Sequence, residues 1–300
     1  MIKFIPFVLA GLGILWLANC SVTPPLQPLI LQGYSKSLKP GDVVQTANGE
    51  ILTFEFLITH LSKAEIIYVG ETHTRLDDHR LQLEILKGLQ ARHPSLILGL
   101  EMVPKEAQPI LDQYSQGLIS EKVFLERIEW EKIWGYPFDL YRGIFHWARA
   151  RHLKIIGLNA PIGVVNHIAQ KGLAALPPTE RSRVASDFHF DYPQHRELIR
   201  QQYAHHPQGK IKNFETFYEA QLAWEETMAE TLAQTLKGLS REGPVLVLVG
   251  RGHIINKLGL PRLVQIRKAH TYKTILSIPP DYPSRSLDPK IADYIWISEK

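Results

Sequence analysis

Apolar runs of strand length, each closed by a glycine and then by polar side chains, recur along this chain. The run 66–69 ends at a glycine and delivers Glu71 and His73 before a helical pattern begins. The run 245–249 ends in the same way and delivers His253. Both patterns predict a buried strand, a Gly-x-x-His turn and a helix.

Further runs of the same kind alternate with stretches of helical apolar spacing. They lie at 95–100, 154–158, 274–278 and 293–297. Strands that alternate with helices predict an α/β fold with a mostly parallel sheet flanked by helices. Residues 161–240 carry helical patterns without a clear strand, so we expect a helical cap or insertion there. A hairpin with an Asn48-Gly49 turn is expected at 43–53.

The N-terminus has the pattern of a targeting segment. An apolar run from Phe4 to Leu17 follows Lys3 and leads to Cys20 in the sequence Leu-Ala-Asn-Cys, which resembles a bacterial lipobox. We therefore expect 1–20 to be a signal and lipoprotein segment with Cys20 lipidated; an uncleaved anchor is the alternative. The proline-rich stretch 21–40 is expected to be a tether and 41–300 the α/β domain. This predicts a membrane-anchored lipoprotein of the cell envelope, in the outer membrane or facing the periplasm.

Composition removes several classes of function. The hydrophobic fraction of 45% is ordinary for a globular protein, and the net charge of +4 is spread without a basic block. We therefore expect no nucleic-acid partner. The single cysteine excludes an intramolecular disulfide, a cysteine-based zinc site and the C-x-x-C-H haem attachment motif.

Polar side chains close the buried strands, and the carboxyl ends of parallel strands meet at one edge of a sheet. Any one of them alone is more often an ordinary loop residue, but together they predict a shared pocket. The set is Glu71, His73, Glu101, Asn159 and His253.

Two helices contribute further candidates to this pocket. His79 lies on the same helical stripe as Leu76 and Leu83, so it points from the buried face of its helix; a hydrogen-bonded core histidine is the plainer interpretation. In the helix expected at 212–237, Gln221 and Glu225 share the apolar stripe. A carboxylate there must be paired or bound, and pairing with an arginine or a backbone amide is the structural alternative. Glu226, one step round, is expected to be solvated.

Such a pocket has two chemically sensible uses. Glu71, His73 and His253 could bind a divalent metal that activates water for hydrolysis. Alternatively, an adjacent apolar surface could hold haem, whose iron accepts histidine or tyrosine as axial ligand. Composition and spacing do not choose among the haem-ligand candidates, which are Tyr136, Tyr141, Tyr192, His195 and Tyr203.

Five motifs in sequence order resemble the ChaN-like haem-binding lipoprotein family, over about residues 40–278. They are Gly70-Glu71-Thr72-His73 with His79, Gly99-Leu100-Glu101-Met102, Leu158-Asn159-Ala160-Pro161, the stretch Ala220–Ala229, and Gly250-Arg251-Gly252-His253 followed by Gly259-Leu260-Pro261-Arg262. The resemblance implies an α/β domain with a helical cap, attached to a membrane and assigned to haem binding and iron acquisition.

The same family is similar to the wider Tiki/TraB and erythromycin-esterase-like group, where these motifs are associated with metal-dependent hydrolysis. Carried over, this implies catalytic roles for Glu71, His73 and His253, with Glu101 in support. A haem-binding protein of iron uptake is our first expectation and a metal-dependent hydrolase the alternative. The expected partners are haem and the membrane; a homodimer stays open, because nothing in the sequence decides the oligomeric state.

Overall fold

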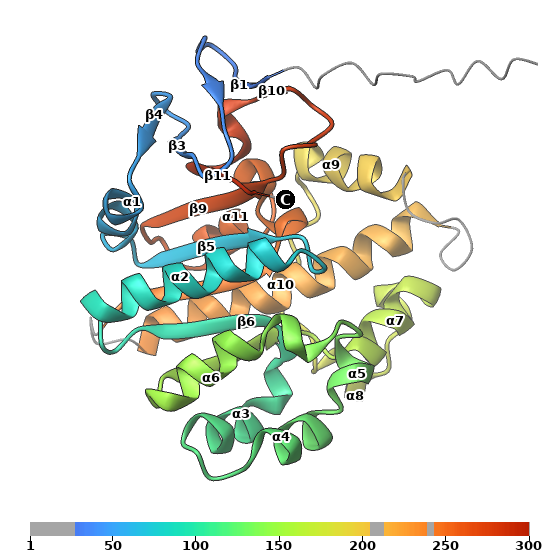
Figure 1. The fold of residues 1–300 in the computed structure, drawn as a ribbon. Helices are drawn as coiled ribbons and strands as arrows, with labels where there is room; N and C mark the ends of the chain where they lie inside the picture. The colour runs from blue at the N-terminus through green and yellow to red at the C-terminus, as the bar shows by residue number, and fades with distance from the viewer. Residues whose placement is uncertain (1–27, 205–212, 239–242, 300) are drawn as a thin grey trace, which may run out of the picture.

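The computed structural model describes residues 28–204, 213–238 and 243–299, and an eight-stranded sheet forms its centre (Figure 1). The strand order is β4-β3-β11-β9-β5-β8-β6-β7, and the strands from β11 to β7 run parallel to one another. The strands are β3 (Val43–Gln45), β4 (Glu50–Leu52), β5 (Ile66–Glu71), β6 (Ile97–Pro104), β7 (Lys154–Asn159), β8 (Val245–Gly250), β9 (Tyr272–Ile278) and β11 (Tyr294–Ile297). The expected hairpin, β3 and β4, pairs antiparallel at one edge. The predicted α/β fold with a mostly parallel sheet is confirmed.

The central strands are apolar throughout because helices cover both faces of the sheet. Every residue of β5 and β8 is buried. In β5, Ile67 and Val69 pack into the core cluster on one face, and Ile66 and Tyr68 pack into the cluster on the other. A strand of this kind reads as a continuous apolar run rather than an alternating pattern.

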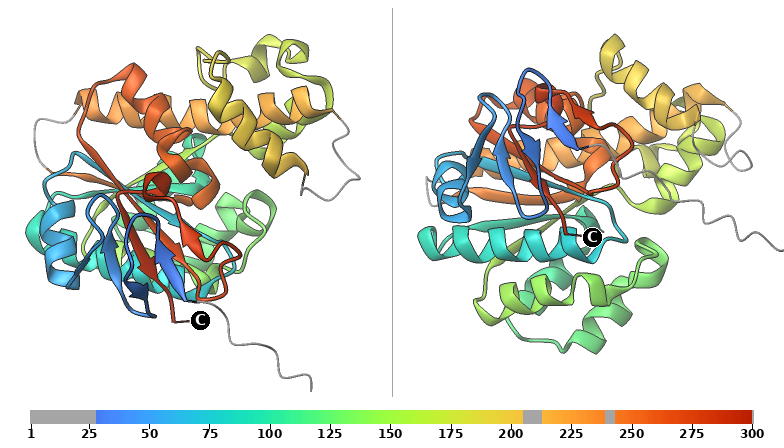
Figure 2. Two further views of the ribbon diagram at one scale, coloured as in Figure 1. Left: turned by 90° about the horizontal axis from the view of Figure 1, so that it is seen from above. Right: turned by 45° about the horizontal axis from the view of Figure 1, so that its top comes forward.

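Two groups of helices cover these faces (Figures 1 and 2). The first group contributes to the core cluster with Ile67, and the second to the cluster with Ile66. The first group is α1 (Phe54–Leu61), α2 (Leu76–Arg92), α3 (Gln108–Ser115), α4 (Glu121–Ile128), α5 (Trp130–Ile133) and α6 (Arg142–Ala150). The second group is α10 (Phe214–Gly238) and α11 (Leu260–Arg267).

A cap of shorter helices follows β7 and leads to α10 (Figure 2). It consists of α7 (Ile162–Lys171), the 3-10 turn η3 (Leu173–Ala175), α8 (Pro178–Arg181) and α9 (Pro193–Ala204). Helix α10 belongs to both parts of the molecule. Its first half carries Ala220 and Ala223 into the cap cluster, whereas Leu232 and Leu236 pack under the sheet. The cap expected over 161–240 therefore merges with the main domain partway along α10.

Short elements complete the described chain. Strands β1 (Leu29–Leu31), β2 (Ser37–Leu38) and β10 (Ser286–Leu287) form a separate three-stranded sheet, so part of the stretch 21–40 expected as a tether pairs with the C-terminal region. The remaining 3-10 turns are η1 (Lys105–Ala107), η2 (Phe138–Leu140), η4 (Arg251–His253), η5 (Ile255–Lys257) and η6 (Pro289–Ile291). None of the helices in the described ranges has the length and apolar character needed to cross a bilayer. The expected signal segment and Cys20 lie outside the described residues.

Candidate functional site

The polar strand ends meet at the carboxyl edge of the sheet, as the sequence predicts. Glu71 ends β5, Glu101 lies in β6, Asn159 ends β7, and His253 follows β8 in η4. A partly open cavity of about 340 Å³ lies among them. Its lining residues are His73, Glu101, Met102, Pro104, Ile133, Trp134, Tyr136, Asn159, Ala160, Ile162, Gln221, Trp224 and His253. An adjoining hollow of about 280 Å³ is lined by Glu71, His73 and His253 together, so these three residues do line shared space.

The Glu71 carboxylate is the centre of the first group of polar contacts. Its Oε1 accepts hydrogen bonds from His73 Nδ1 at 2.8 Å and from the Tyr141 hydroxyl at 2.7 Å. Its Oε2 accepts from Gln82 Nε2 at 2.7 Å and lies 3.2 Å from His79 Nδ1. Burial opposes ionisation, but the hydrogen bonds from His73 and His79 outweigh it and lower the pKa of Glu71 to about 2. Glu71 is therefore a buried anion with both oxygens engaged.

His79 lies beneath this group and not in the cavity lining. It is 2% exposed, and its Nε2 lies 3.1 Å from the backbone oxygen of His73. Its ring packs against Tyr141 with centroids 4.4 Å apart. The stripe position predicted from the sequence is correct, and the contacts are those of a core histidine that fixes the corner between β5 and α2.

The His73 ring stands between Glu71 and the cavity. Its Nδ1 bonds to Glu71, and its faces meet Trp134 at 4.8 Å and Tyr136 at 4.9 Å between ring centroids. Burial lowers the pKa of His73, but the hydrogen bond to Glu71 outweighs burial and the net shift is upward. A Cβ on Gly250 would lie 2.9 Å from His73 Cε1, so only glycine leaves room for this ring.

His253 lies between two carboxylates. Its Nδ1 is 2.9 Å from Glu225 Oε1 and its Nε2 is 3.3 Å from Glu101 Oε1. Burial favours the neutral imidazole, but the two carboxylates outweigh burial and raise the pKa of His253 to about 10. His253 is therefore a buried cation at neutral pH, held between the sheet and α10.

Glu225 brings the cap into this arrangement. It is fully buried, and its second oxygen lies 2.9 Å from His195 Nε2 of α9 in an ion pair without hydrogen-bond geometry. Burial opposes its ionisation, but His195 and His253 outweigh burial and lower the pKa of Glu225 to about 2. The partners of this carboxylate are thus two histidines and the Gln221 amide rather than an arginine or a backbone amide.

The two amide side chains of the set have different surroundings. Gln221 lines the cavity, with its Nε2 3.2 Å from His253 Nδ1. Asn159 is 9% exposed, and its Oδ1 accepts a hydrogen bond from the backbone N–H of Ala160 at 2.9 Å. Asn159 also lines the cavity, and its amide nitrogen has no hydrogen-bond partner among the described residues.

The five haem-ligand candidates fall into two groups. Tyr141 is fully buried and donates to Glu71, and His195 is 2% exposed and paired with Glu225. Tyr136, Tyr192 and Tyr203 are partly exposed. Tyr136 lies at the cavity mouth, the Tyr192 ring has the Arg262 guanidinium 3.6 Å from its centroid, and Tyr203 packs against Phe217. The structure does not bring these three tyrosines into one site.

Sequence reasoning missed several residues of the site. Gln82 donates to Glu71 from the position three residues after His79, a spacing that places both on one face of α2. Trp134 and Trp224 form cavity walls, and no sequence signal separates them from ordinary core aromatics.

The side chains expected to bind a divalent metal are engaged with one another. Both oxygens of Glu71 accept hydrogen bonds, and both nitrogens of His253 face carboxylates. Across the described residues, no three His, Cys, Asp or Glu side chains converge in a way that could hold a metal ion. The donor set as arranged does not fit a divalent metal.

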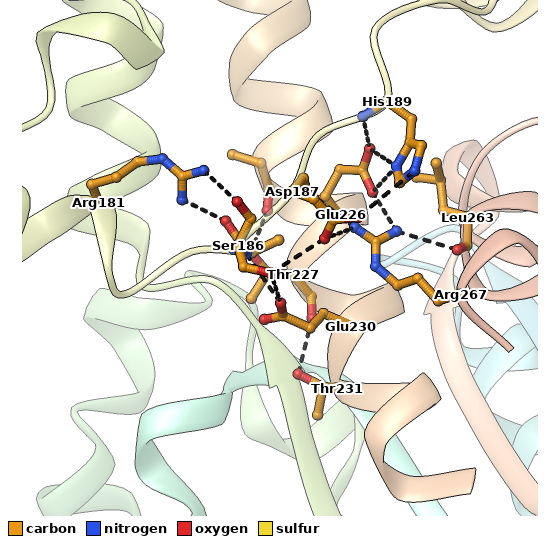
Figure 3. Close-up of polar contacts among 12 residues, drawn as sticks. Arg181, Ser186, Asp187, His189, Glu226, Thr227, Glu230, Thr231, Leu263 and Arg267 are labelled. Carbon is orange, nitrogen blue, oxygen red and sulfur yellow. Dashed lines mark hydrogen bonds and ion pairs between the residues drawn. The ribbon is translucent and has the colours of Figure 1, made fainter. Parts of the chain in front are cut away.

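A second polar cluster fastens the cap to the main domain (Figure 3). Glu226 is fully buried, which corrects the expectation that it is solvated. It accepts from the backbone N–H of His189 at 2.5 Å and pairs with Arg267 of α11 at 2.6 Å. Arg267 also contacts Asp187 at 2.9 Å. Glu226 is enclosed because the segment 185–190 and α11 cover both sides of α10, which the sequence spacing does not reveal.

Comparison with known proteins gives both a family and a fold. Residues 57–264 match the family model described as "Haem-binding uptake, Tiki superfamily, ChaN". A solved structure described as "Cofacial heme binding to ChaN of Campylobacter jejuni" has a TM-score of 0.67 at 20% identity, covering 85% of this chain and 95% of that chain. This likeness is one of fold.

More distant solved structures are also similar, with lower scores. The type III effector HopBA1 has a TM-score of 0.47 at 13% identity, covering 81% of this chain and 92% of that chain. The erythromycin esterase EreC has a TM-score of 0.47 at 13% identity, covering 80% and 76%. No curated protein matches the chain. The family model spans most of the chain, including every strand that lines the cavity, and the chain therefore belongs to the ChaN family of haem-binding uptake proteins in the Tiki superfamily.

Proposed function

We propose that this protein is a membrane-anchored haem-binding protein of haem and iron acquisition. The observation that carries the proposal is the family match over residues 57–264, which includes strands β5 to β8, the cap and both Gly-x-x-His turns. The ChaN fold over most of both chains is consistent with it. The family supplies haem binding, and the N-terminal sequence adds the membrane anchor.

The side chains available as iron ligands support this function. Tyrosine oxygen binds haem iron, and a tyrosine can do so only where its hydroxyl reaches a surface that admits the macrocycle. Tyr141 and His195 are buried and engaged with carboxylates. Tyr136, Tyr192 and Tyr203 are partly exposed and remain candidates.

Charge distinguishes two of these tyrosines. Haem carries two anionic propionates, which favour a cationic surface. Tyr136 borders an open groove of about 920 Å³ whose lining includes Glu126, Glu129, Glu131 and Asp139. Tyr192 instead has the cationic Arg262 over its ring. Charge therefore favours Tyr192 over Tyr136 as the residue next to bound haem.

Haem titration of the full-length protein tests the proposal. At micromolar protein we expect a saturable shift of the Soret band. We further expect that Tyr192→Phe changes the Soret spectrum and weakens binding, whereas Tyr141→Phe, a matched change at a buried hydroxyl, leaves the spectrum as it is. Absence of a Soret shift in the unmodified protein contradicts haem binding.

The membrane anchor rests on the sequence that precedes the described residues. The apolar run before Cys20, and the position of the single cysteine at the end of that run, favour lipidation of Cys20 in the cell envelope, on the outer membrane or facing the periplasm. The proposal also leaves room for a homodimer. Light scattering of the haem-free protein distinguishes one copy from two.

Hydrolysis at the Glu/His cavity is a second candidate, favoured by the state of His73. Glu71 is ionised and holds a proton on His73 Nδ1, so in the neutral imidazole Nε2 carries a lone pair toward the cavity. His73 could take a proton from a water whose oxygen adds to an ester carbonyl, and could then return that proton to the departing alcohol.

An esterase assay and a metal analysis test this second candidate. We expect His73→Asn to lower the rate of 4-nitrophenyl acetate hydrolysis at least about 100-fold if His73 is the general base. His146→Asn, at an exposed histidine of α6, is the matched control. If the unmodified protein hydrolyses the ester no faster than His73→Asn does, hydrolysis at this cavity is contradicted. Stoichiometric metal in protein purified without chelator would support hydrolysis by a bound metal.

A further inference from the structure

The partly open cavity of about 340 Å³ is lined by both apolar and polar side chains. Trp134, Tyr136, Trp224, Met102 and Ile162 line it, and its volume lies at the lower end of the range for small-molecule sites. A tetrapyrrole with its side chains is larger than this space. A ligand of a different size class therefore fits the cavity.

The charges around the cavity are paired within the protein. Glu71 bonds to His73 at 2.8 Å, and His253 lies 3.3 Å from Glu101 and 2.9 Å from Glu225. In the described part of the chain, the carboxylates of Glu71, Glu101 and Glu225 each lie next to an imidazole. A ligand that brought a formal charge of its own would enter without a counter-ion, which is costly in a buried site.

Several polar atoms at the cavity have no hydrogen-bond partner among the described residues. They include His73 Nε2, the indole nitrogen of Trp134 and the amide nitrogen of Asn159, whose Oδ1 already accepts from Ala160. Asn159 is 9% exposed and lines the cavity, so its amide nitrogen is a hydrogen-bond donor available to a ligand there. The Asn159 amide therefore pairs with an acceptor on the ligand, and His73 Nε2, the lone-pair nitrogen of the neutral imidazole, pairs with a donor.

We infer that this cavity is a binding site for a small uncharged molecule with a flat apolar body and a carboxamide or similar group. The apolar body lies against Trp134, Tyr136 and Trp224, and the carbonyl oxygen accepts from Asn159. The nitrogen of the carboxamide faces His73. This site is separate from the surface proposed for haem and does not depend on that function.

Benzamide is the probe, because it combines a flat ring with a carboxamide and carries no charge. Isothermal titration of benzamide into the full-length protein is expected to give saturable binding. Benzoate has the same shape with a formal charge, and we expect it to bind at least about tenfold more weakly. Equal or tighter binding of benzoate overturns the uncharged-ligand inference without any variant.

Matched variants place the probe in the cavity. Asn159→Leu removes the amide donor at similar size and is expected to weaken benzamide binding roughly 3- to 10-fold. Asn166→Leu makes the same change at an exposed position of α7 and is expected to leave binding unchanged. If the two variants bind benzamide equally well, Asn159 does not hold the carbonyl and the inference fails.

Filling the cavity provides an independent test. Ile162 is the first residue of α7 and lines the cavity with partial exposure, so Ile162→Trp adds volume there. We expect this variant to lose benzamide binding while retaining the haem-dependent Soret shift of the unmodified protein. Benzamide binding that survives Ile162→Trp, or that haem abolishes, overturns a separate cavity site. If the unmodified protein shows no Soret shift with haem, only the haem proposal is contradicted.

Discussion

The buried carboxylates Glu71, Glu101 and Glu225 each face one or more imidazoles, and this pairing decides which residues tolerate substitution. Glu225 contacts His253 and His195, and Glu71 contacts His73 and His79. Breaking a buried ion pair leaves an uncompensated charge, which costs far more than losing an exposed pair. These contacts therefore join the cap to the sheet through electrostatics as well as packing.

Removing Glu225 is expected to destabilise the protein strongly. Glu225→Ala leaves His253 with Glu101 alone and leaves His195 without its ion-pair partner. We expect the free energy of unfolding to fall by about 3–5 kcal/mol, measured by urea denaturation. Glu215 lies on α10, as Glu225 does, and forms an exposed ion pair with Arg196 of α9. Glu215→Ala is expected to cost at most about 1 kcal/mol. Equal losses in the two variants would show that the buried pair is not special.

The raised pKa of His253 makes stability depend on pH in a definite direction. The pKa of His253 is raised from 6.5 to about 10. Its contribution is complete below pH 6.5, where both states are protonated, and is lost as pH rises to about 10, because the unfolded chain releases the proton first. We expect the free energy of unfolding to fall over this interval, and to fall less in His253→Gln. The exposed His146→Gln should follow the unmodified protein; an unchanged pH dependence in His253→Gln contradicts the assignment.

The sequence predicts the position of these residues better than their partners. Periodicity places His79 on the buried face of α2, and the strand ends place Glu71, Glu101 and His253 at one edge. The partners of Glu225 depend on how α9 packs against α10, which no local pattern encodes. Glu226 illustrates the same limit, because its burial follows from α11 and the segment 185–190.

At the scale of elements, glycines near the carboxyl ends of the strands allow neighbouring strands to approach each other closely at the site. A Cβ on Gly157 of β7 would lie 2.6 Å from the backbone oxygen of Pro104 in β6. The pairing of these strands shifts register between Leu100 and Pro104. The carboxyl ends of β6 and β7, which carry Glu101 and Asn159, therefore depend on this close contact.

Gly157→Ala tests that dependence. The added methyl group meets backbone rather than a flexible side chain, so we expect a loss of about 1–3 kcal/mol in urea unfolding. Gly163→Ala adds the same group in α7, where nothing lies within 4 Å, and should leave stability unchanged or raise it by up to about 1 kcal/mol. A neutral Gly157→Ala would mean that β6 and β7 separate without cost.

Long apolar strands are predictable because burial on both faces gives a continuous signal, as in β5 and β8. Strands β2 and β10 each have two residues, which is too short for any periodicity, and they fall in stretches rich in proline and serine. The double role of α10 is invisible for another reason. Its apolar pattern is the same whether the covering surface is the cap or the sheet.

At the scale of the whole molecule, the proposed membrane anchor can be tested at Cys20. Cys20→Ser removes the only thiol that could carry a lipid. We expect the unmodified protein to fractionate with membranes and to enter the detergent phase on Triton X-114 partitioning, and Cys20→Ser to enter the aqueous phase. Detergent-phase recovery of both proteins would favour an uncleaved anchor over lipidation.

We propose two separate ligand sites, one beside the partly exposed Tyr192 and one in the Glu/His cavity. A crystal structure of the protein grown with haem tests the account most directly, because it locates the iron. We predict the iron bonded to the hydroxyl oxygen of Tyr192, with His73 and Asn159 left free in the cavity. Haem iron bound within the cavity to His73, or crystals without haem at saturating concentration, would contradict it.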